Sequence, residues 1–139
     1  MGQTNYSGTE RRRFRRVRVG VTVIYRKEDP PDVRIRTAHG ERAGSMVDIS
    51  VGGMAIVTDV EVPTAEHLRI RFTLSEIEDK SVSFYGDVEL LGQVRSCVPC
   101  EGKMFRVGIA FVNIDERNRF DIANFVNAVE QRLQGRDSQ

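Results

Sequence analysis

The sequence contains few of the residues that build metal centres and nucleophilic active sites. Its 139 residues include only two histidines, His39 and His67, and two cysteines, Cys97 and Cys100. Because neither histidine is close to the cysteines along the chain, a four-ligand zinc site is difficult to assemble. No histidine lies near a plausible nucleophile, and no pair of carboxylates falls in an expected cleft. The sequence therefore favours a non-enzymatic protein without a metal or other cofactor.

The two cysteines form a Cys-x-x-Cys pair, a spacing that redox and zinc proteins use. A thioredoxin-like motif needs a helix that begins at the first cysteine, whereas Pro99, Glu101 and Gly102 predict a hairpin loop. We interpret Cys97 and Cys100 as structural or incidental thiols, with a redox or metal-binding role as the minor alternative.

Long hydrophobic runs are also absent. No stretch approaches the roughly 18 apolar residues of a membrane span, and residues 1–9 are polar, without the apolar centre of a signal peptide. The hydrophobic fraction of 40% and the charged fraction of 29% are ordinary for a soluble globular protein. We expect one cytoplasmic domain over residues 10–134, with a polar leader over residues 1–9 and a tail over residues 135–139.

What the sequence does have is a dense group of arginines. Between Glu10 and Arg18, six of the nine residues are arginine, although the whole chain carries a net charge of only +1. A guanidinium makes two parallel hydrogen bonds to phosphate or to the O6/N7 edge of guanine, and its flat face stacks on bases. This arginine segment, residues 10–18, predicts a site for an anionic, planar ligand. A solvated charge run is the alternative.

Alternation of apolar and polar residues predicts six short strands. The first, residues 17–25, follows the arginine segment directly. The others are expected over residues 41–49, 54–58, 67–74, 82–95 and 104–112, with a charged turn at residues 76–80. In the second strand, period two places Met46 and Asp48 on the same face. In the fifth, Gly86 and Gly92 are candidates for bends or bulges.

After Asp115, which is a suitable N-cap, the apolar period becomes helical. The predicted stripe comprises Phe120, Ala123, Asn124, Val126, Asn127, Val129 and Leu133. Gly135 is expected to end the helix, and the stripe serves either to cap the strands or partly to dock a partner. Six strands with hairpin spacing and one closing helix predict a mainly β fold, a small antiparallel barrel capped by a C-terminal helix.

A second candidate site follows the second strand, at Asp48-Ile49-Ser50-Val51-Gly52-Gly53. The carboxylate of Asp48 can accept hydrogen bonds from N1–H and N2–H of guanine, and the Ser50 hydroxyl can reach a phosphate or a ring nitrogen. Gly52 and Gly53 allow a positive φ and the close approach of a flat ligand. Taken alone, this pattern is explained equally well by an Asx turn in a hairpin.

The two stretches together closely resemble the PilZ domain family, whose members bind the bacterial second messenger cyclic di-GMP. The resemblance rests on Arg12-x-x-x-Arg16 before the first strand, followed by Asp48-x-Ser50-x-x-Gly53 between the second and third. It extends over about residues 10–134 and includes the Val-Gly-Ile-Ala-Phe strand and the terminal helix. It implies a six-stranded antiparallel PilZ-type β-barrel.

The resemblance also implies roles for individual residues. Arg12 and Arg16 would clasp the phosphates and the guanine Hoogsteen edges, and Asp48 and Ser50 would hold a guanine from the barrel face. Gly53, next to Gly52, would keep the turn open.

The residue before the first motif arginine is Arg11, and an arginine there accompanies an intercalated ligand dimer in this family. We therefore expect two ligands per site. Family members also recruit an arginine from later strands, for which Arg95 is a candidate. Arg13, Arg15 and Arg18 do not match the motif and are expected to steer the ligand electrostatically.

The implied function is a receptor that orders its arginine segment when it binds cyclic di-GMP and then signals to a downstream protein or to a second copy of the chain, as a homodimer. Two alternatives remain: a PilZ-like interaction module without ligand binding, and a nucleic-acid-binding barrel. The second is disfavoured because the aromatic residues do not interleave with basic ones, and because the chain outside the arginine segment is slightly acidic.

Overall fold

The computed structural model describes residues 17–28, 40–78 and 81–137. Within them, six strands are followed by one helix. The elements are β1 (Val17–Lys27), β2 (Arg42–Ile49), β3 (Gly53–Thr58), β4 (His67–Glu78), β5 (Ser81–Pro99), β6 (Phe105–Val112) and α2 (Glu116–Asp137).

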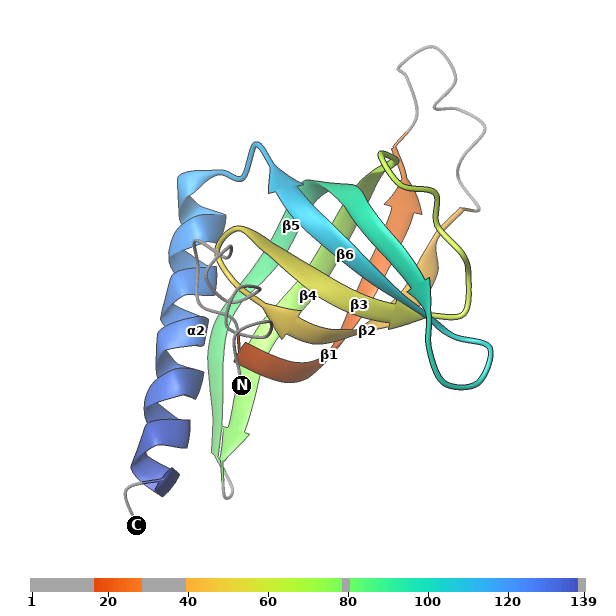
Figure 1. The fold of residues 1–139 in the computed structure, drawn as a ribbon. Helices are drawn as coiled ribbons and strands as arrows, with labels where there is room; N and C mark the ends of the chain where they lie inside the picture. Colours follow the sequence, from red (N-terminus) through yellow and green to blue (C-terminus); the bar gives the residue numbers. More distant parts are fainter. Residues whose placement is uncertain (1–16, 29–39, 79–80, 138–139) are drawn as a thin grey trace, which may run out of the picture.

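The six strands form a closed antiparallel barrel in the order β1-β2-β3-β6-β5-β4 (Figure 1). This confirms the predicted mainly β fold and its closing helix. Strands consecutive in the sequence pair as antiparallel neighbours, except that β3 and β4 do not pair. The pairings of β3 with β6 and of β1 with β4 close the ring. Because β3 lies between β2 and β6, residues far apart in sequence share one outer surface.

The barrel interior is filled by the inward-facing residues of every strand. The fully buried aliphatic side chains include Val23, Met46, Ile49, Met54, Ile56, Ile70, Leu74 and Val107. Burial of one such side chain contributes about 1.5–3 kcal/mol. The interior is therefore a packed core, and a polar ligand has to bind outside it.

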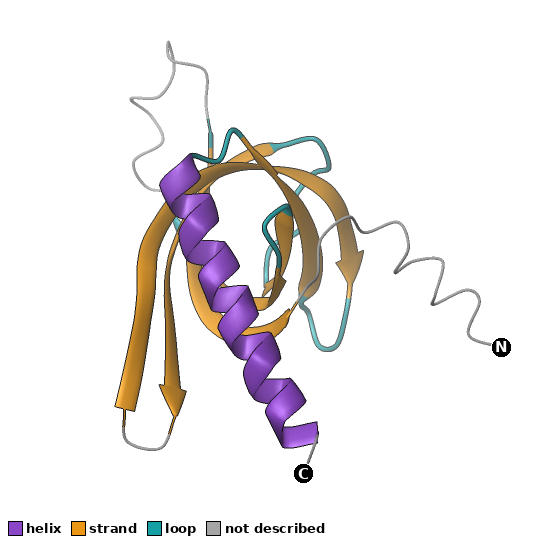
Figure 2. Ribbon diagram, turned by 90° about the vertical axis from the view of Figure 1, so that its left-hand side faces the viewer, coloured by secondary structure: helices purple, strands orange, loops and turns teal. Residues whose placement is uncertain are grey.

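Helix α2 lies across the barrel beside the β4–β5 hairpin and packs mainly on β5 (Figure 2). Its N-cap is as predicted: the Asn118 amide donates to Oδ1 of Asp115 at 2.7 Å. The predicted apolar stripe is only partly right. The buried apolar face comprises Ile122, Phe125, Val126 and Val129. Phe120 is 64% exposed because it lies on the opposite side of the helix, and Leu133 is 42% exposed.

The β4–β5 hairpin is longer than predicted, because residues 76–78 continue β4 instead of forming a charged turn. The reason is tertiary. The Glu76 carboxylate accepts from Arg132 of α2, and from the Tyr85 hydroxyl at 3.4 Å. The Tyr85 ring also meets the edge of Phe125, with centroids 5.5 Å apart. The helix thus supports a hairpin that extends past the barrel.

Of three further expectations at glycines, the one at Gly86 is confirmed and those at Gly92 and Gly135 are wrong. The register shift expected near Gly86 is present, between Leu74 and Ser75 of the paired strand, but Gly92 lies in regular ladder and marks no bulge. The helix continues past Gly135 to Asp137.

Candidate ligand-binding site

Asp48 reaches the outer surface of the barrel because of a bulge in β2. Met46 pairs with Ile56, but Asp48 pairs with Ala55, so Val47 is an extra residue in the ladder. Met46 and Ile56 both face the core and are fully buried. The bulge therefore turns Asp48 outward, away from the face that strict alternation predicted. The expected shared face of Met46 and Asp48 is wrong for this reason.

On the outer surface Asp48 meets an arginine that the sequence analysis did not select. Nη2 of Arg106, on β6, donates to Oδ2 of Asp48 at 2.9 Å. Asp48 is only 8% exposed, and an ionised carboxylate so poorly hydrated needs such a partner. The available signal was the outward row of β6, where Arg106 is followed at alternate positions by Gly108 and Ala110. Its pairing with Asp48 depends on a contact 58 residues along the chain.

The turn after Asp48 is held by its own hydrogen bonds. The Ser50 amide donates to the Gly53 carbonyl at 2.9 Å, and the Gly52 amide donates to Oγ of Ser50 at 3.1 Å. The Ser50 hydroxyl is buried and makes a longer contact of 3.4 Å with the Gly53 carbonyl. In this structure Ser50 therefore shapes the turn, whereas the hairpin alternative invoked an Asx turn.

Gly53 has a packing requirement of its own. A Cβ there would overlap the backbone carbonyl oxygen of Ile109 in the neighbouring strand β6. A backbone atom cannot rotate aside as a side chain can, so the residue at this position must lack a Cβ. This close approach of two strands places the Ser50–Gly53 turn directly beside β6.

Asp48 and Arg106 lie at a hollow of about 300 Å³ on the outer surface. Its lining residues are Asp48, Gly52, Met54, Ala55, Arg95, Ser96, Val98, Arg106, Gly108, Ile109 and Ala110. Ala55, Gly108 and Ser96 continue the row that begins at Asp48, each in register with the next across β3, β6 and β5. Small side chains in this row form a floor that a flat base can approach.

Arg95 lines the same hollow because of a second bulge. Val94 pairs with Ile109 and Ser96 pairs with Gly108, so Arg95 is the extra residue in β5. Among the described residues, those that line the hollow and carry a charge are two arginines and one aspartate. The surroundings favour an anion over a cation.

The last two residues of the arginine segment, Val17 and Arg18, belong to β1 and pair with the strand that carries Asp48. In the β1–β2 ladder, Arg18 pairs with Asp48 and Val17 pairs with Ile49. The end of the arginine segment, at Val17 and Arg18 of β1, therefore lies beside the part of β2 that carries Asp48. The predicted ligand residues Arg11, Arg12 and Arg16 lie outside the described residues.

The chain can also be compared with known proteins. The family model of the PilZ domain matches residues 10–128. The chain belongs to the PilZ domain family. No curated protein matches it in sequence.

Solved structures with this PilZ fold agree with the barrel and helix. The Bacillus subtilis inhibitor of motility MotI/DgrA is 17% identical, with a TM-score of 0.65 over 89% of this chain and 52% of its own. The PilZ domain of Escherichia coli YcgR, solved with c-di-GMP, is 14% identical, with a TM-score of 0.62 over 93% of this chain and 98% of its own. The MrkH–c-di-GMP complex of K. pneumonia is 15% identical, with a TM-score of 0.59 over 92% of this chain and 54% of its own. The chain thus spans about half the length of MotI/DgrA and MrkH.

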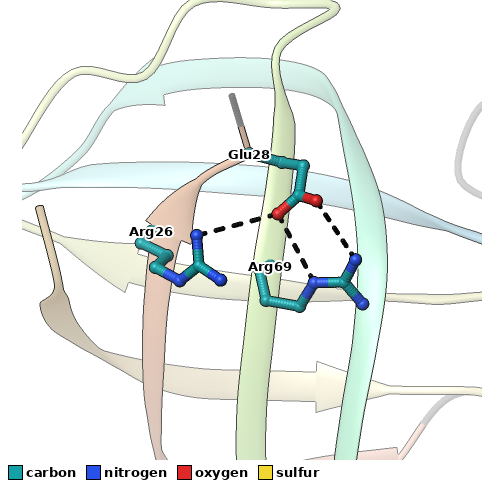
Figure 3. Close-up of polar contacts among 3 residues, drawn as sticks. All are labelled: Arg26, Glu28 and Arg69. Atoms are coloured by element: carbon teal, nitrogen blue, oxygen red, sulfur yellow. Dashed lines mark hydrogen bonds and ion pairs between the residues drawn. The ribbon is translucent and has the colours of Figure 1, made fainter. Parts of the chain in front are cut away.

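A larger hollow, of about 860 Å³, lies on the other side of this PilZ barrel, over β1, β4 and β5. It contains none of the described motif residues, and the arginine among its described lining residues, Arg71, is held by Glu41 at 3.1 Å. Nearby on the same strands, Glu28 binds both Arg26 and Arg69, at 3.8 and 3.3 Å (Figure 3). Asp87 and Glu89 also line the larger hollow beside Arg71, so its described lining is less suited to an anion than that of the smaller hollow.

Two other kinds of site find no support in the described part of the PilZ domain. Histidine, cysteine and carboxylate side chains there form no cluster of three suited to a metal ion. Cys97 lies in β5 and Cys100 just after it. Three residues of extended chain span about 10 Å, beyond the roughly 7 Å between Cα atoms that a disulfide allows. Among the described helices, none has the length and apolarity to cross a membrane.

Proposed function

We propose that the protein is a non-enzymatic cytoplasmic receptor for cyclic di-GMP. The observation that carries the proposal is the position of Asp48 on the outer surface, beside a hollow with small residues and two arginines, at the strand that pairs with the end of the arginine segment. An anionic dinucleotide needs a carboxylate only for its guanine donors and needs cations for its phosphates. Both occur here.

In this proposal the residues divide between two stretches. Arg12 and Arg16 clasp the phosphates and guanine Hoogsteen edges, and Arg11 favours two intercalated ligands. Asp48 binds a guanine edge, while Ser50 holds the turn that presents it. These assignments follow the PilZ motif.

The same proposal includes a switch. Arginines packed this densely repel one another until an anionic ligand neutralises them, so binding orders residues 10–16 over the site. The ordered segment then changes the surface offered to a downstream protein or to a second copy of the chain.

The test is calorimetric titration of the full chain with cyclic di-GMP. Arg16→Ala and Asp48→Ala should each weaken binding at least about tenfold, because each removes hydrogen bonds to a charged group. Arg69→Ala is the matched control: this arginine is occupied by Glu28 on the other side of the barrel, so its loss should leave the affinity unchanged.

A stoichiometry near two would support the role of Arg11. Absence of binding by the unmodified chain would refute the receptor and leave the interaction-module alternative. Equal binding of GMP or unrelated polynucleotides, with a steep loss of affinity in salt, would instead indicate a nucleic-acid-binding barrel.

A further inference from the structure

We propose that Arg106 is a specificity-determining residue which, together with Asp48, recognises the Watson–Crick edge of guanine. The inference rests on the proposed function and extends it to a residue outside the two motif stretches. It is carried by the ion pair between Asp48 and Arg106 and by the position of both residues in the hollow.

The pair presents three hydrogen-bonding groups in a row. Oδ1 and Oδ2 of Asp48 are acceptors, and the guanidinium beside Oδ2 supplies a donor. A carboxylate accepts at about four positions, so the contact with Arg106 is compatible with further donors on the same group. The order of the row is therefore acceptor, acceptor, donor.

The Watson–Crick edge of guanine is complementary to this row. It offers the N2–H donor, the N1–H donor and the O6 acceptor, in that order. The Asp48–Arg106 pair thus has the hydrogen-bonding order of a cytosine edge. Adenine offers an acceptor at N1 and a donor at its 6-amino group. Its N1 would face an acceptor oxygen of Asp48, and its amino group would face the donor of Arg106. Unpaired polar groups in a partly buried site disfavour such a ligand.

Burial and charge explain why the arginine is needed. The Asp48 side chain is 12% exposed and that of Arg106 is 46% exposed. Arg106 can therefore hold the carboxylate from the rim while part of its guanidinium faces the hollow. It also compensates a negative charge that would otherwise repel the phosphates of the ligand.

The experiment compares affinities for cyclic di-GMP, its hypoxanthine analogue cyclic di-IMP, and cyclic di-AMP. Arg106→Met removes the donor and keeps most of the side-chain length. We expect about a tenfold or greater loss of affinity for cyclic di-GMP, with a similar fall in the affinity ratio of cyclic di-GMP to cyclic di-AMP. The preference for cyclic di-GMP over cyclic di-IMP should also shrink, because the Asp48 carboxylate is no longer held against N2–H.

Arg95→Met is the matched control. Arg95 lines the same hollow, and the ion pair described here joins Asp48 to Arg106. Loss of Arg95 should weaken all three ligands by a common factor and leave their ratios within about twofold, as expected for loss of a phosphate-attracting charge. Arg106→Lys keeps one cationic donor and should restore part of the affinity ratio that Arg106→Met loses. If the role of Arg106 were only structural, the lysine would restore the stability of the fold but not the ratio.

The outcomes separate the two proposals. If the unmodified chain binds cyclic di-GMP and Arg106→Met keeps the unmodified ratios, the role of Arg106 is refuted and the receptor stands. A change of ratio in Arg95→Met as large as that in Arg106→Met would refute it too. If the unmodified chain binds none of the ligands, both proposals fail. Should Arg106→Met not fold, Arg106→Lys alone decides: a ratio equal to that of the unmodified chain overturns the inference.

Discussion

Two glycines beside the hollow provide a test that separates what the fold requires from what a ligand requires. Gly53 begins β3, and a Cβ there would overlap the Ile109 carbonyl oxygen. At Gly108 on β6, a Cβ would instead meet the Ser96 hydroxyl, at 2.6 Å. A hydroxyl on a rotatable side chain can move away, whereas a carbonyl in a strand cannot. Alanine at the two positions should therefore have opposite effects.

The expected cost of Gly53→Ala follows from these contacts. Overpacking costs about 1–3 kcal/mol. Its relief requires separation of β3 from β6, which strains the 3.0 Å hydrogen bond from Phe111 to Gly52 and the 2.9 Å bond from Ser50 to Gly53. Each such bond contributes about 0.5–1.5 kcal/mol. The free energy of unfolding should fall by about 2–4 kcal/mol, which corresponds to a fall in Tm of about 10 °C for a chain of this size.

Gly108→Ala should leave the free energy of unfolding unchanged or raise it by up to about 1 kcal/mol, because glycine weakens a strand interior. If the hollow binds the ligand, the added methyl group should still reduce the affinity for cyclic di-GMP. Urea and thermal unfolding, followed by circular dichroism, measure the stabilities, and calorimetry measures the affinity. The reasoning is refuted if Gly53→Ala unfolds within about 0.5 kcal/mol of the unmodified chain, or if Gly108→Ala is the less stable of the two.

Three further predictions concern the rest of the domain. Phe125 is buried and Phe120 is exposed, so Phe125→Ala should lower the free energy of unfolding by about 3–5 kcal/mol and Phe120→Ala by less than about 0.5 kcal/mol. Equal losses of the two variants in urea unfolding would contradict the buried face of α2 described above. Burial, then the nearby Glu76 carboxylate, raises the pKa of Tyr85 above its usual 10.0. The stability that the neutral phenol contributes is therefore present below pH 10 and is lost as the pH rises through the folded-state pKa. Tyr85→Phe should lose less stability than the unmodified chain between about pH 9 and 11. The same pH profile in both proteins would contradict this. Cys100, which is exposed, should react with iodoacetamide faster than the partly buried Cys97, and mass spectrometry after mild oxidation should find no bond between them within one chain.

Local sequence patterns were sufficient for the elements of the barrel. Alternation between apolar and polar residues reports directly which face of a strand is buried, so six strands and their hairpin order could be predicted. The cap at Asp115 was equally local, because the residue bonds an amide three positions away. The face of α2 was harder, since Phe120 and Phe125 are equally apolar and only the surface of β5 decides which is buried.

The candidate site was predicted in its motif residues and in Arg95, which was expected as an arginine from a later strand and lines the hollow. Asp48 and the glycines stand in one short stretch, and the arginine segment is visible from its density alone. Arg106 was not predicted, because its contact with Asp48 depends on the strand order. That order places β6 beside β3 and brings these two residues, 58 positions apart, within 2.9 Å. No short-range pattern records such a pairing.

The two bulges explain why the site occupies this part of the barrel. Strict alternation would turn Asp48 toward the core with Met46, where an ionised carboxylate is costly. The extra residue Val47 prevents this, and the extra residue Arg95 breaks the alternation of β5 on the other side of the β3–β6 pair. Each bulge breaks the regular ladder pairing, and both lie beside the hollow that Asp48 lines. Register shifts also occur between Arg18 and Val21 of β1 and between Leu74 and Ser75 of β4, so a bulge by itself does not mark a site. What distinguishes the bulges in β2 and β5 is that they bring Asp48 and Arg95 to the same hollow.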